Sequence, residues 1–238
     1  MGEWSNSASV QEIAPGLWRW TEAHPDWRPN AAPGSLGDWE RYVGSVLYTS
    51  PEAAVFFDPL LPVDTGPFWD WADRCVGGRT VSVLTTVGWH RRSRAAVAER
   101  YDASVSRAKR SLPAGVESFV VRGAGETIYW LPRHRALVTG DRILGAPDGG
   151  LRLCPASWLR YLPSRISLPE LRERLRPLLQ LPVERVLVSH GEPVLHGGGE
   201  ALAQALAEPC IFPRRPSLRG RSRDQVPGPG RGGHDAKG

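Results

Sequence analysis

The sequence predicts an α/β (α+β) fold, in which two β-rich halves pack together with helices outside as a four-layer αββα sandwich. Three observations predict it. Strand-like segments come first in the chain, strand–helix units follow them, and a second cycle of the same kind completes the order. The composition is 41% hydrophobic and 23% charged over 238 residues, which is typical of a globular protein that can bury a large core.

The first half begins with antiparallel strands. Val10–Trp20 predicts a strand, a Pro-Gly turn and a second strand. Glu22–Glu40 has no clear period and predicts a long connection. Arg41–Thr49 and Ala53–Phe57 then predict two strands joined as a hairpin by Ser-Pro-Glu, and this hairpin ends at Asp58.

Strand–helix units follow this hairpin. We expect a helix around Pro67–Arg74, a strand over Thr80–Leu84 and a helix over Ala95–Tyr101. The strand is short, apolar and rich in valine, which is typical of a buried strand. Ala103–Val105 and Ser118–Val121 are candidates for two further short strands.

The second half repeats this order. Glu126–Leu131 and Ala136–Gly140 predict a second hairpin, which ends at Asp141. Leu151–Pro163 has no regular period, carries Trp158 and Tyr161, and has no helix or strand assigned to it. Pro169 suits the first turn of a helix. The buried face of that helix is expected to consist of leucines, namely Leu171, Leu175, Leu178 and Leu179.

The chain then predicts one more strand and one more helix. Val183–Val188 is a short apolar run that ends at His190, and Gly199–Ala207 has the pattern of an amphipathic helix. We expect one domain over residues 10–212, with a flexible N-terminus over 1–9. Residues 213–238 are rich in Arg, Gly and Pro and predict a disordered tail.

The positive charge belongs to this tail. From Pro213 onward there are seven basic residues against two aspartates, a net charge of +5 that equals the charge of the whole chain. The body is therefore neutral, and nucleic-acid binding by it is not expected. An interaction of the tail with an acidic partner stays open beside the simpler interpretation of a solvated segment. Nothing in the sequence predicts an oligomeric state.

The chain predicts no membrane segment. No apolar run approaches the roughly 18–20 residues that a membrane helix needs, and the N-terminus lacks a basic region followed by an apolar one. The cysteines are Cys75, Cys154 and Cys210, an odd number without CxxC spacing, which favours reduced thiols. We therefore expect a cytoplasmic protein.

The polar cluster after the strand Thr80–Leu84 is the first candidate site. The apolar run stops before Gly88, and Trp89, His90, Arg91 and Arg92 follow on a loop ahead of a helix. α/β proteins commonly place functional groups where a strand ends before a helix.

Four segments resemble the metallo-β-lactamase superfamily in its own order. They are F-F-D-P-L, L-T-T-V-G-W-H-R-R, T-I-Y-W-L-P-R-H-R-A-L-V-T-G-D and R-V-L-V-S-H-G. The resemblance spans roughly residues 12–206 and implies the αββα metallo-β-lactamase fold of a hydrolase superfamily. It also implies that the family's metal signature, T-H-x-H-x-D-H, aligns with Thr85–Arg91.

This alignment predicts a degenerate metal motif. Thr86 and Gly88 stand where the first two ligand histidines would be, and the mid-chain histidine expected near Arg122–Glu126 is absent. The first metal site has thus lost its three imidazoles. At the second site, His90 replaces an aspartate and Arg91 a histidine, while Asp141 and His190 remain. The resemblance makes Asp58 a residue that supports the loop.

Two interpretations of the remaining residues stay open. In the first, the dinuclear centre is lost, no cofactor is bound, and Arg91 or Arg92 pairs with the Asp141 carboxylate. The protein would then be a non-catalytic protein that binds a small molecule or serves as an accessory protein. In the alternative, His90, Asp141 and His190 hold one zinc or iron ion. The protein would then be a mononuclear metal-dependent hydrolase of an ester, thioester or lactone.

Most of the other histidines and tryptophans have simpler interpretations. His24 could be a replacement ligand on a mobile loop, but it is expected to be an exposed loop residue, and His134 and His196 are expected to be solvated. Most of the tryptophans are expected to pack in the core or loops, whereas Trp89 and Trp158 are candidates for the mouth of the site, near an acyl or aromatic ligand.

Overall fold

We describe residues 10–106 and 112–207 of a computed structural model of the chain. The predictions for residues 1–9, for Cys210 and for the tail from residue 213 lie outside these residues. Within the described part, no helix has both the length and the apolar character needed to cross a bilayer.

The first sheet has six strands in the order β1-β2-β3-β4-β5-β6. Its first four strands are antiparallel, and β4, β5 and β6 run parallel to one another. Helix α1 (Thr65–Val76) connects β4 to β5, and α2 (Arg94–Tyr101) connects β5 to β6, as parallel neighbours require. The strands are β1 (Gln11–Ala14), β2 (Leu17–Ala23), β3 (Tyr42–Thr49), β4 (Ala53–Phe57), β5 (Thr80–Leu84) and β6 (Ser104–Ser106).

The second sheet has the order β12-β9-β8-β7, with β12 parallel to β9 and the other pairs antiparallel. A separate small hairpin, β10 with β11, follows β9. A 3-10 turn, η1 (Pro132–His134), joins β8 to β9. The strands are β7 (Glu117–Val121), β8 (Glu126–Leu131), β9 (Ala136–Val138), β10 (Ile143–Gly145), β11 (Leu151–Leu153) and β12 (Arg185–Leu187).

The remaining helices belong to the second half. They are α3 (Ala156–Arg160), α4 (Leu168–Leu175) with the 3-10 helix η2 (Arg176–Gln180), and α5 (Gly198–Ala207). The start of α4 is set by a capping box, in which Ser167 caps the backbone N–H of Glu170 and the Glu170 side chain caps that of Ser167. The predicted helix at Pro169 is thus confirmed.

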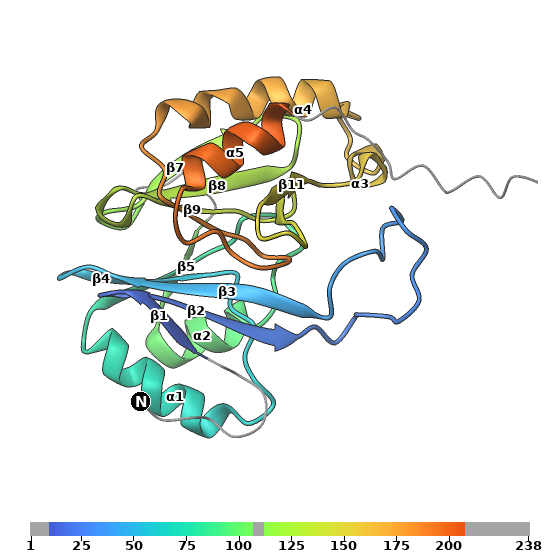
Figure 1. The fold of residues 1–238 in the computed structure, drawn as a ribbon. Coiled ribbons are helices and arrows are strands. Elements are labelled where there is room, and N and C mark those ends of the chain that lie inside the picture. Colours follow the sequence, from blue (N-terminus) through green and yellow to red (C-terminus); the bar gives the residue numbers. More distant parts are fainter. Residues whose placement is uncertain (1–9, 107–111, 208–238) are drawn as a thin grey trace, which may run out of the picture. The chain divides into compact units, whose positions relative to one another are not determined.

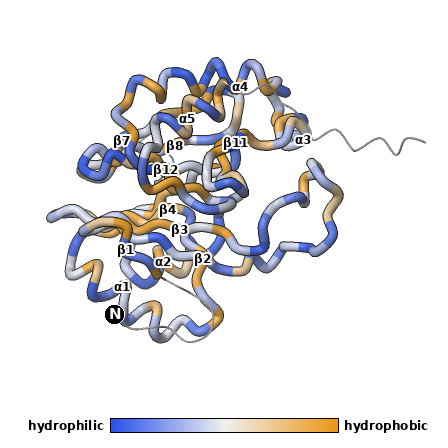
Figure 2. Tube along the Cα trace, in the orientation of Figure 1, coloured by the Kyte–Doolittle hydropathy of each residue, from blue (hydrophilic) through white to orange (hydrophobic). Residues whose placement is uncertain are grey.

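The helices cover the outer faces of two facing sheets, with α1 and α2 on one side and α4 and α5 on the other (Figure 1). Strand β4 shows how the sequence builds these layers. Ala53, Val55 and Phe57 point into the apolar cluster between the two sheets, whereas Ala54 and Phe56 point to the cluster beneath α1. A third cluster lies between the second sheet and α4 and α5. Hydrophobic residues accordingly concentrate on the inner strands (Figure 2). The predicted αββα sandwich is confirmed.

Three expectations about local structure were wrong. The stretch 151–163 contains β11 and α3, which the sequence does not predict, because Leu151, Trp158 and Leu159 reach the core without a simple period. Leu179 is 39% exposed, since the chain tightens from α4 into a 3-10 helix and turns that residue outward. His134 is buried rather than solvated, with its ring edge-on to Tyr48.

The two sheets also meet at their backbones near the predicted site. The N–H of Thr127 donates to the carbonyl of Thr86 at 2.8 Å, and the N–H of Gly44 donates to the carbonyl of Ser189 at 2.8 Å. A Cβ on Gly44 would lie 2.6 Å from the Val188 carbonyl oxygen, so glycine is required for this approach.

Candidate functional site

The candidate site is assembled from the carboxyl ends of four strands. Asp58 follows β4, His90 lies on the loop after β5, Asp141 follows β9 and His190 follows β12. Because β4 runs parallel to β5, and β9 to β12, the ends of each pair meet at one edge. Each sheet therefore contributes two of these four side chains.

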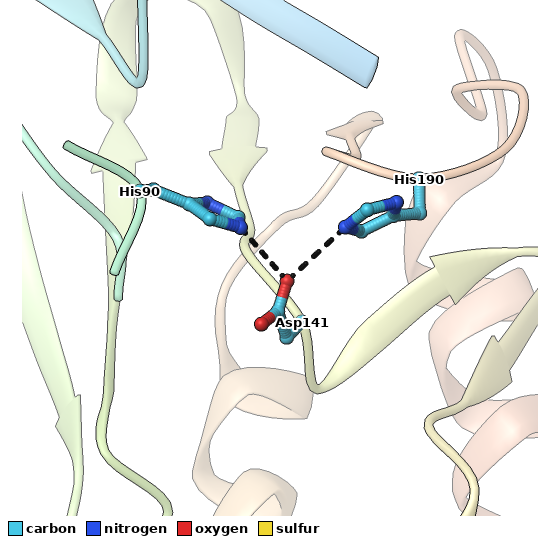
Figure 3. A group of neighbouring side chains, drawn as sticks. All are labelled: His90, Asp141 and His190. Atoms are coloured by element: carbon cyan, nitrogen blue, oxygen red, sulfur yellow. Dashed lines mark ion pairs between the residues drawn. The ribbon is translucent and has the colours of Figure 1, made fainter. Parts of the chain in front are cut away.

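His90, Asp141 and His190 converge at this edge (Figure 3). Nε2 of His90 lies 3.0 Å from Oδ1 of Asp141, and Nε2 of His190 lies 3.3 Å from the same oxygen. All three side chains are buried, and one potential ligand atom from each lies within 4.8 Å of the others. Two ligands on a tetrahedral ion with bonds of about 2.0–2.2 Å are separated by roughly 3.3–3.5 Å. The donor set and its spacing thus fit one metal ion.

The shared oxygen supports this interpretation. Oδ1 of Asp141 is buried and makes no hydrogen bond among the described residues, although two imidazole nitrogens lie close to it. Buried carboxylate oxygens usually have a hydrogen-bond partner. A buried carboxylate oxygen that two imidazole nitrogens approach is an expected feature of a ligand set.

Asp58 fixes the orientation of the His90 ring. Its Oδ2 lies 2.9 Å from Nδ1 of His90, and its Oδ1 accepts the backbone N–H of Thr86 at 2.9 Å. The Thr86 hydroxyl also donates to Asp58. With Nδ1–H directed at Asp58, Nε2 of His90 faces Asp141, the carboxylate–histidine arrangement that supports metal ligands in proteins. The predicted supporting role of Asp58 agrees with these contacts.

The same contacts raise the pKa of the His90 imidazole. Burial lowers the pKa of its imidazole, but the carboxylates of Asp141 and Asp58 more than offset this and raise the pKa to about 9. The pKa of Asp141 lies well below its usual range, because the nearby His90 and His190 outweigh the effect of burial, which raises it. Without a metal, His90 is thus an imidazolium that bridges two carboxylates.

Glu126 was not anticipated and positions Asp141. The Glu126 side chain is buried at the start of β8, and its carboxylate accepts the backbone N–H groups of Gly140, Asp141 and Arg142 at 2.8–2.9 Å. These three bonds fix the turn between β9 and β10. A glutamate that opens the apolar strand E-T-I-Y-W-L could have indicated a buried structural carboxylate.

Trp89 and Arg142 lie near the loop over 122–126, where the resemblance places the third histidine of the lost site. The indole N–H of Trp89 donates to Oδ2 of Asp141 at 2.7 Å. Nε of Arg142 donates to the carbonyl of Ala124, in the loop over 122–126, at 2.9 Å. The Arg142 guanidinium carbon lies 5.6 Å from the Trp89 ring centroid, within cation–π range. An indole and a guanidinium thus stand between Asp141 and that loop.

The expected pairing of Arg91 or Arg92 with Asp141 was wrong. Arg91 is exposed, and neither arginine forms an ion pair with Asp141 within the described part of the chain. Arg92 adopts φ 37° and turns inward. Its guanidinium donates to the carbonyls of Gly44 and Asp58 at 2.7 and 2.9 Å, and to the hydroxyl of Ser189 at 2.6 Å. Arg92 therefore ties the loop of His90 to the loop of His190.

A pocket of about 470 Å³ opens above these residues. His90, Asp141 and His190 line its floor, and aromatic side chains, including Trp89 and Trp158 as expected, line its walls. Ring centroids of Trp39 and Trp158 lie 5.5 and 5.8 Å from that of His190. The ligand set is thus accessible through this pocket.

His24 and His196 are the remaining histidines among the described residues. His24 is half-buried, lies edge-on to Trp39 with centroids 5.1 Å apart and lines the pocket, so the expectation of an exposed loop residue was wrong. Burial lowers the pKa of His24, as does the charge of Arg92. The side chain of His196 is 85% exposed, as predicted.

Comparison with known proteins identifies the fold. No protein-family model matches the sequence, and no curated protein matches it. Solved metallo-β-lactamases match the structure. That of Erythrobacter litoralis is 13% identical, with 84% of this chain and 95% of that chain covered and a TM-score of 0.56. FIM-1 from Pseudomonas aeruginosa, in its mono-zinc form, is 12% identical, with 84% and 95% covered and a TM-score of 0.54. The Hirschia baltica enzyme is 12% identical, with 84% and 97% covered and a TM-score of 0.53. The chain therefore has the metallo-β-lactamase fold, which confirms the resemblance found in the sequence.

Proposed function

We propose that the protein is a mononuclear metal-dependent hydrolase of an ester, thioester or lactone, in which one ion replaces the two-metal centre implied by the resemblance. The observation that carries this proposal is the convergence of His90, Asp141 and His190 at the floor of a pocket. Two imidazoles and one carboxylate suit Zn²⁺ or Fe²⁺ and leave positions open. An ion held there would supply Lewis-acid chemistry toward a carbonyl oxygen and water.

The chain's own residues would prepare this chemistry. Asp58 holds His90 with Nε2 directed at Asp141, and Glu126 fixes the turn that carries Asp141. Arg92 holds the loop of His190 through Ser189. The aromatic walls would exclude water from a bound substrate, which strengthens electrostatic interactions at the floor.

The loss of the first site is supported by what stands in its place. Thr86 is bonded to Asp58, Gly88 has no side chain, and Trp89 and Arg142 stand beside Asp141. A guanidinium near the missing ion's position opposes a second dication. The proposal is therefore one ion for each chain.

A second candidate is a metal-free protein that binds a small molecule without catalysis, the first of the two interpretations from the sequence. The observation that favours it is the pKa of His90, raised to about 9 by two carboxylates. At neutral pH a proton occupies this nitrogen when no metal does, so metal must compete with it.

Elemental analysis of the purified full-length protein separates the candidates. The hydrolase requires about one equivalent of Zn or Fe for each chain, lost in His190→Ala and retained in the matched His196→Ala variant, whose imidazole is exposed. Absence of metal after growth with added Zn and Fe, with unfolding unaffected by a chelator, would leave the metal-free candidate.

A further inference from the structure

Exposed apolar and aromatic side chains form much of the accessible surface of the pocket, beside the exposed Asp26, whereas His90, Asp141 and His190 are buried. Leu36, Trp89 and Tyr161 line the pocket from three separate segments and are 46%, 54% and 73% exposed. Single exposed apolar residues are ordinary, but a group of them around one cavity usually marks a binding site. The ligand that covers them should be apolar at its outer end.

The indole N–H groups of Trp89 and Trp158 are already used inside the protein. The indole N–H of Trp89 donates to Asp141, and that of Trp158 donates to the carbonyl of Ser35 at 2.8 Å. These two rings therefore offer a ligand their faces and edges rather than a hydrogen bond. Flat faces of this kind favour a planar aromatic group over a saturated one of equal size.

The rim of the pocket is held in place before a ligand arrives. The Trp158–Ser35 bond and a bond from the Ser157 hydroxyl to the Gly34 carbonyl tie the connection over 24–40 to α3. Nε1 of Trp27 donates to the carbonyl of Trp39 at 3.0 Å within the same connection. A prepared rim lowers the entropy cost of binding a rigid ring.

The charges near the pocket argue against a cationic ligand. Aromatic cages bind quaternary ammonium groups, but here Arg142 already occupies cation–π range of Trp89. Arg92 adds a second guanidinium to the lining, which also contains the exposed side chain of Asp26. A ligand cation would be repelled by both guanidinium groups.

The charges also argue against a carboxylate ligand. Nη1 and Nη2 of Arg92 are used by Gly44, Asp58 and Ser189, and its Nε is buried. Nη2 of Arg142 is buried as well. No guanidinium nitrogen named here is both free and accessible to pair with an anion.

We infer that the pocket recognises a neutral aryl ester or thioester, with its ring against Trp39, Trp158 and Tyr161 and its carbonyl directed at the His90–Asp141–His190 floor. The reaction rests on the proposed function, but recognition of the neutral ring rests on the walls alone. Binding can therefore be tested in the full-length protein after treatment with a chelator.

The test uses calorimetric titration with four probes. They are N-methyl-2-naphthamide, its fully saturated decahydro counterpart, benzyltrimethylammonium and 2-naphthoate, and none of them can be turned over as an ester. The naphthamide should bind about 2- to 10-fold more tightly than each of the others, a range typical of an added aromatic contact. Tyr161→Leu should remove most of this preference. Leu179→Ala, which changes an exposed leucine outside the pocket, should leave it intact.

Each outcome bears on the inference. Equal binding of the naphthamide and the decahydro probe, or a Tyr161→Leu variant with undiminished preference, overturns the aromatic assignment. Tighter binding of the ammonium or of the naphthoate overturns the assignment of a neutral ligand. If the aromatic preference is present in a protein that takes up no metal, the hydrolase proposal fails and this inference stands. If the protein takes up metal but shows no aromatic preference, the hydrolase proposal stands and this inference fails.

Discussion

At the scale of single residues, the function depends on whether Nε2 of His90 carries a proton or a metal ion. Its other nitrogen faces Asp58 in either state, because the two atoms lie 2.9 Å apart. The same carboxylate therefore serves a metal ligand by fixing the ring and serves an imidazolium by pairing with it. This dual role is why the ligand geometry alone leaves two functional candidates.

Replacement of Asp58 should weaken metal binding. Asp58→Asn keeps the size of the side chain, and asparagine tolerates the φ of 46° found here. It removes the charge behind His90, and we expect the Zn²⁺ dissociation constant, measured by chelator competition, to rise about 10- to 100-fold. Asp64→Asn, at the N-cap of α1, is the matched control. An unchanged constant would contradict the role assigned to Asp58.

The stability of the metal-free protein should depend on pH through His90. The pKa of His90 is about 9 in the folded protein against an ordinary value of 6.5, so its ion pairs stabilise the fold fully below pH 6.5. This contribution is lost as the pH rises through about 9. Urea unfolding at pH 6 and pH 9.5 should show the loss in the wild type and a smaller one in His90→Gln. A larger loss of stability in His90→Gln than in the wild type would contradict the assignment of this pH dependence to His90.

At the scale of elements, the turn between β9 and β10 depends on the buried carboxyl group of Glu126, whose pKa burial raises to about 7, rather than on its own sequence. Glu126→Gln would set an amide N–H₂ against backbone N–H donors that now meet a carboxylate. We expect a loss of about 2–4 kcal/mol in the free energy of unfolding, together with weaker metal binding. Glu117→Gln, on an exposed position of β7, should change neither. A stable Glu126→Gln variant with full metal affinity would contradict the positioning role.

The elements show which parts of the molecule could be predicted from sequence. Strands β4, β5 and β8 were predicted with the bounds that the structure has, because their apolar runs are short and bounded by polar or turn residues. Helix α3 was missed, since five residues contain too little periodicity to detect. The strand ends at Asp58, His90, Asp141 and His190 could be named because the resemblance aligned them.

The contacts of arginines and aromatic residues in the site could not be predicted in the same way. Arg91 and Arg92 are neighbours in sequence, and the choice of which one turns inward depends on a left-handed backbone at residue 92. Trp89 reaches Asp141 from the loop after β5. Arg142, next to Asp141 in the sequence, is held by the carbonyl of Ala124 in the loop between β7 and β8. The Trp89–Asp141 contact arises from packing between the two halves, and the Arg142–Ala124 contact from packing between two loops of the second half.

At the scale of the whole molecule, the core lies within the predicted domain. The three apolar clusters are built from residues no later than Leu206 among those that the structure describes. A chain that ends at Phe212 should therefore keep the melting temperature and the metal content of the full-length protein. A chain that ends at Gly199 should be destabilised, because it lacks Leu202, Ala205 and Leu206. A lower melting temperature for the chain ending at Phe212 would show that the tail supports the domain.

Because both sheets contribute residues to the site, metal binding at the site reports whether the two sheets are packed together. Asp58 and His90 come from one sheet, and Asp141 and His190 from the other. Neither half alone can therefore form the complete ligand set. In a cobalt-substituted protein, the visible absorption should disappear at the denaturant concentration at which the halves separate, even where helical circular dichroism persists. A bound cobalt ion would then link the two halves, and the loss of its absorption would report their separation as the first step of unfolding.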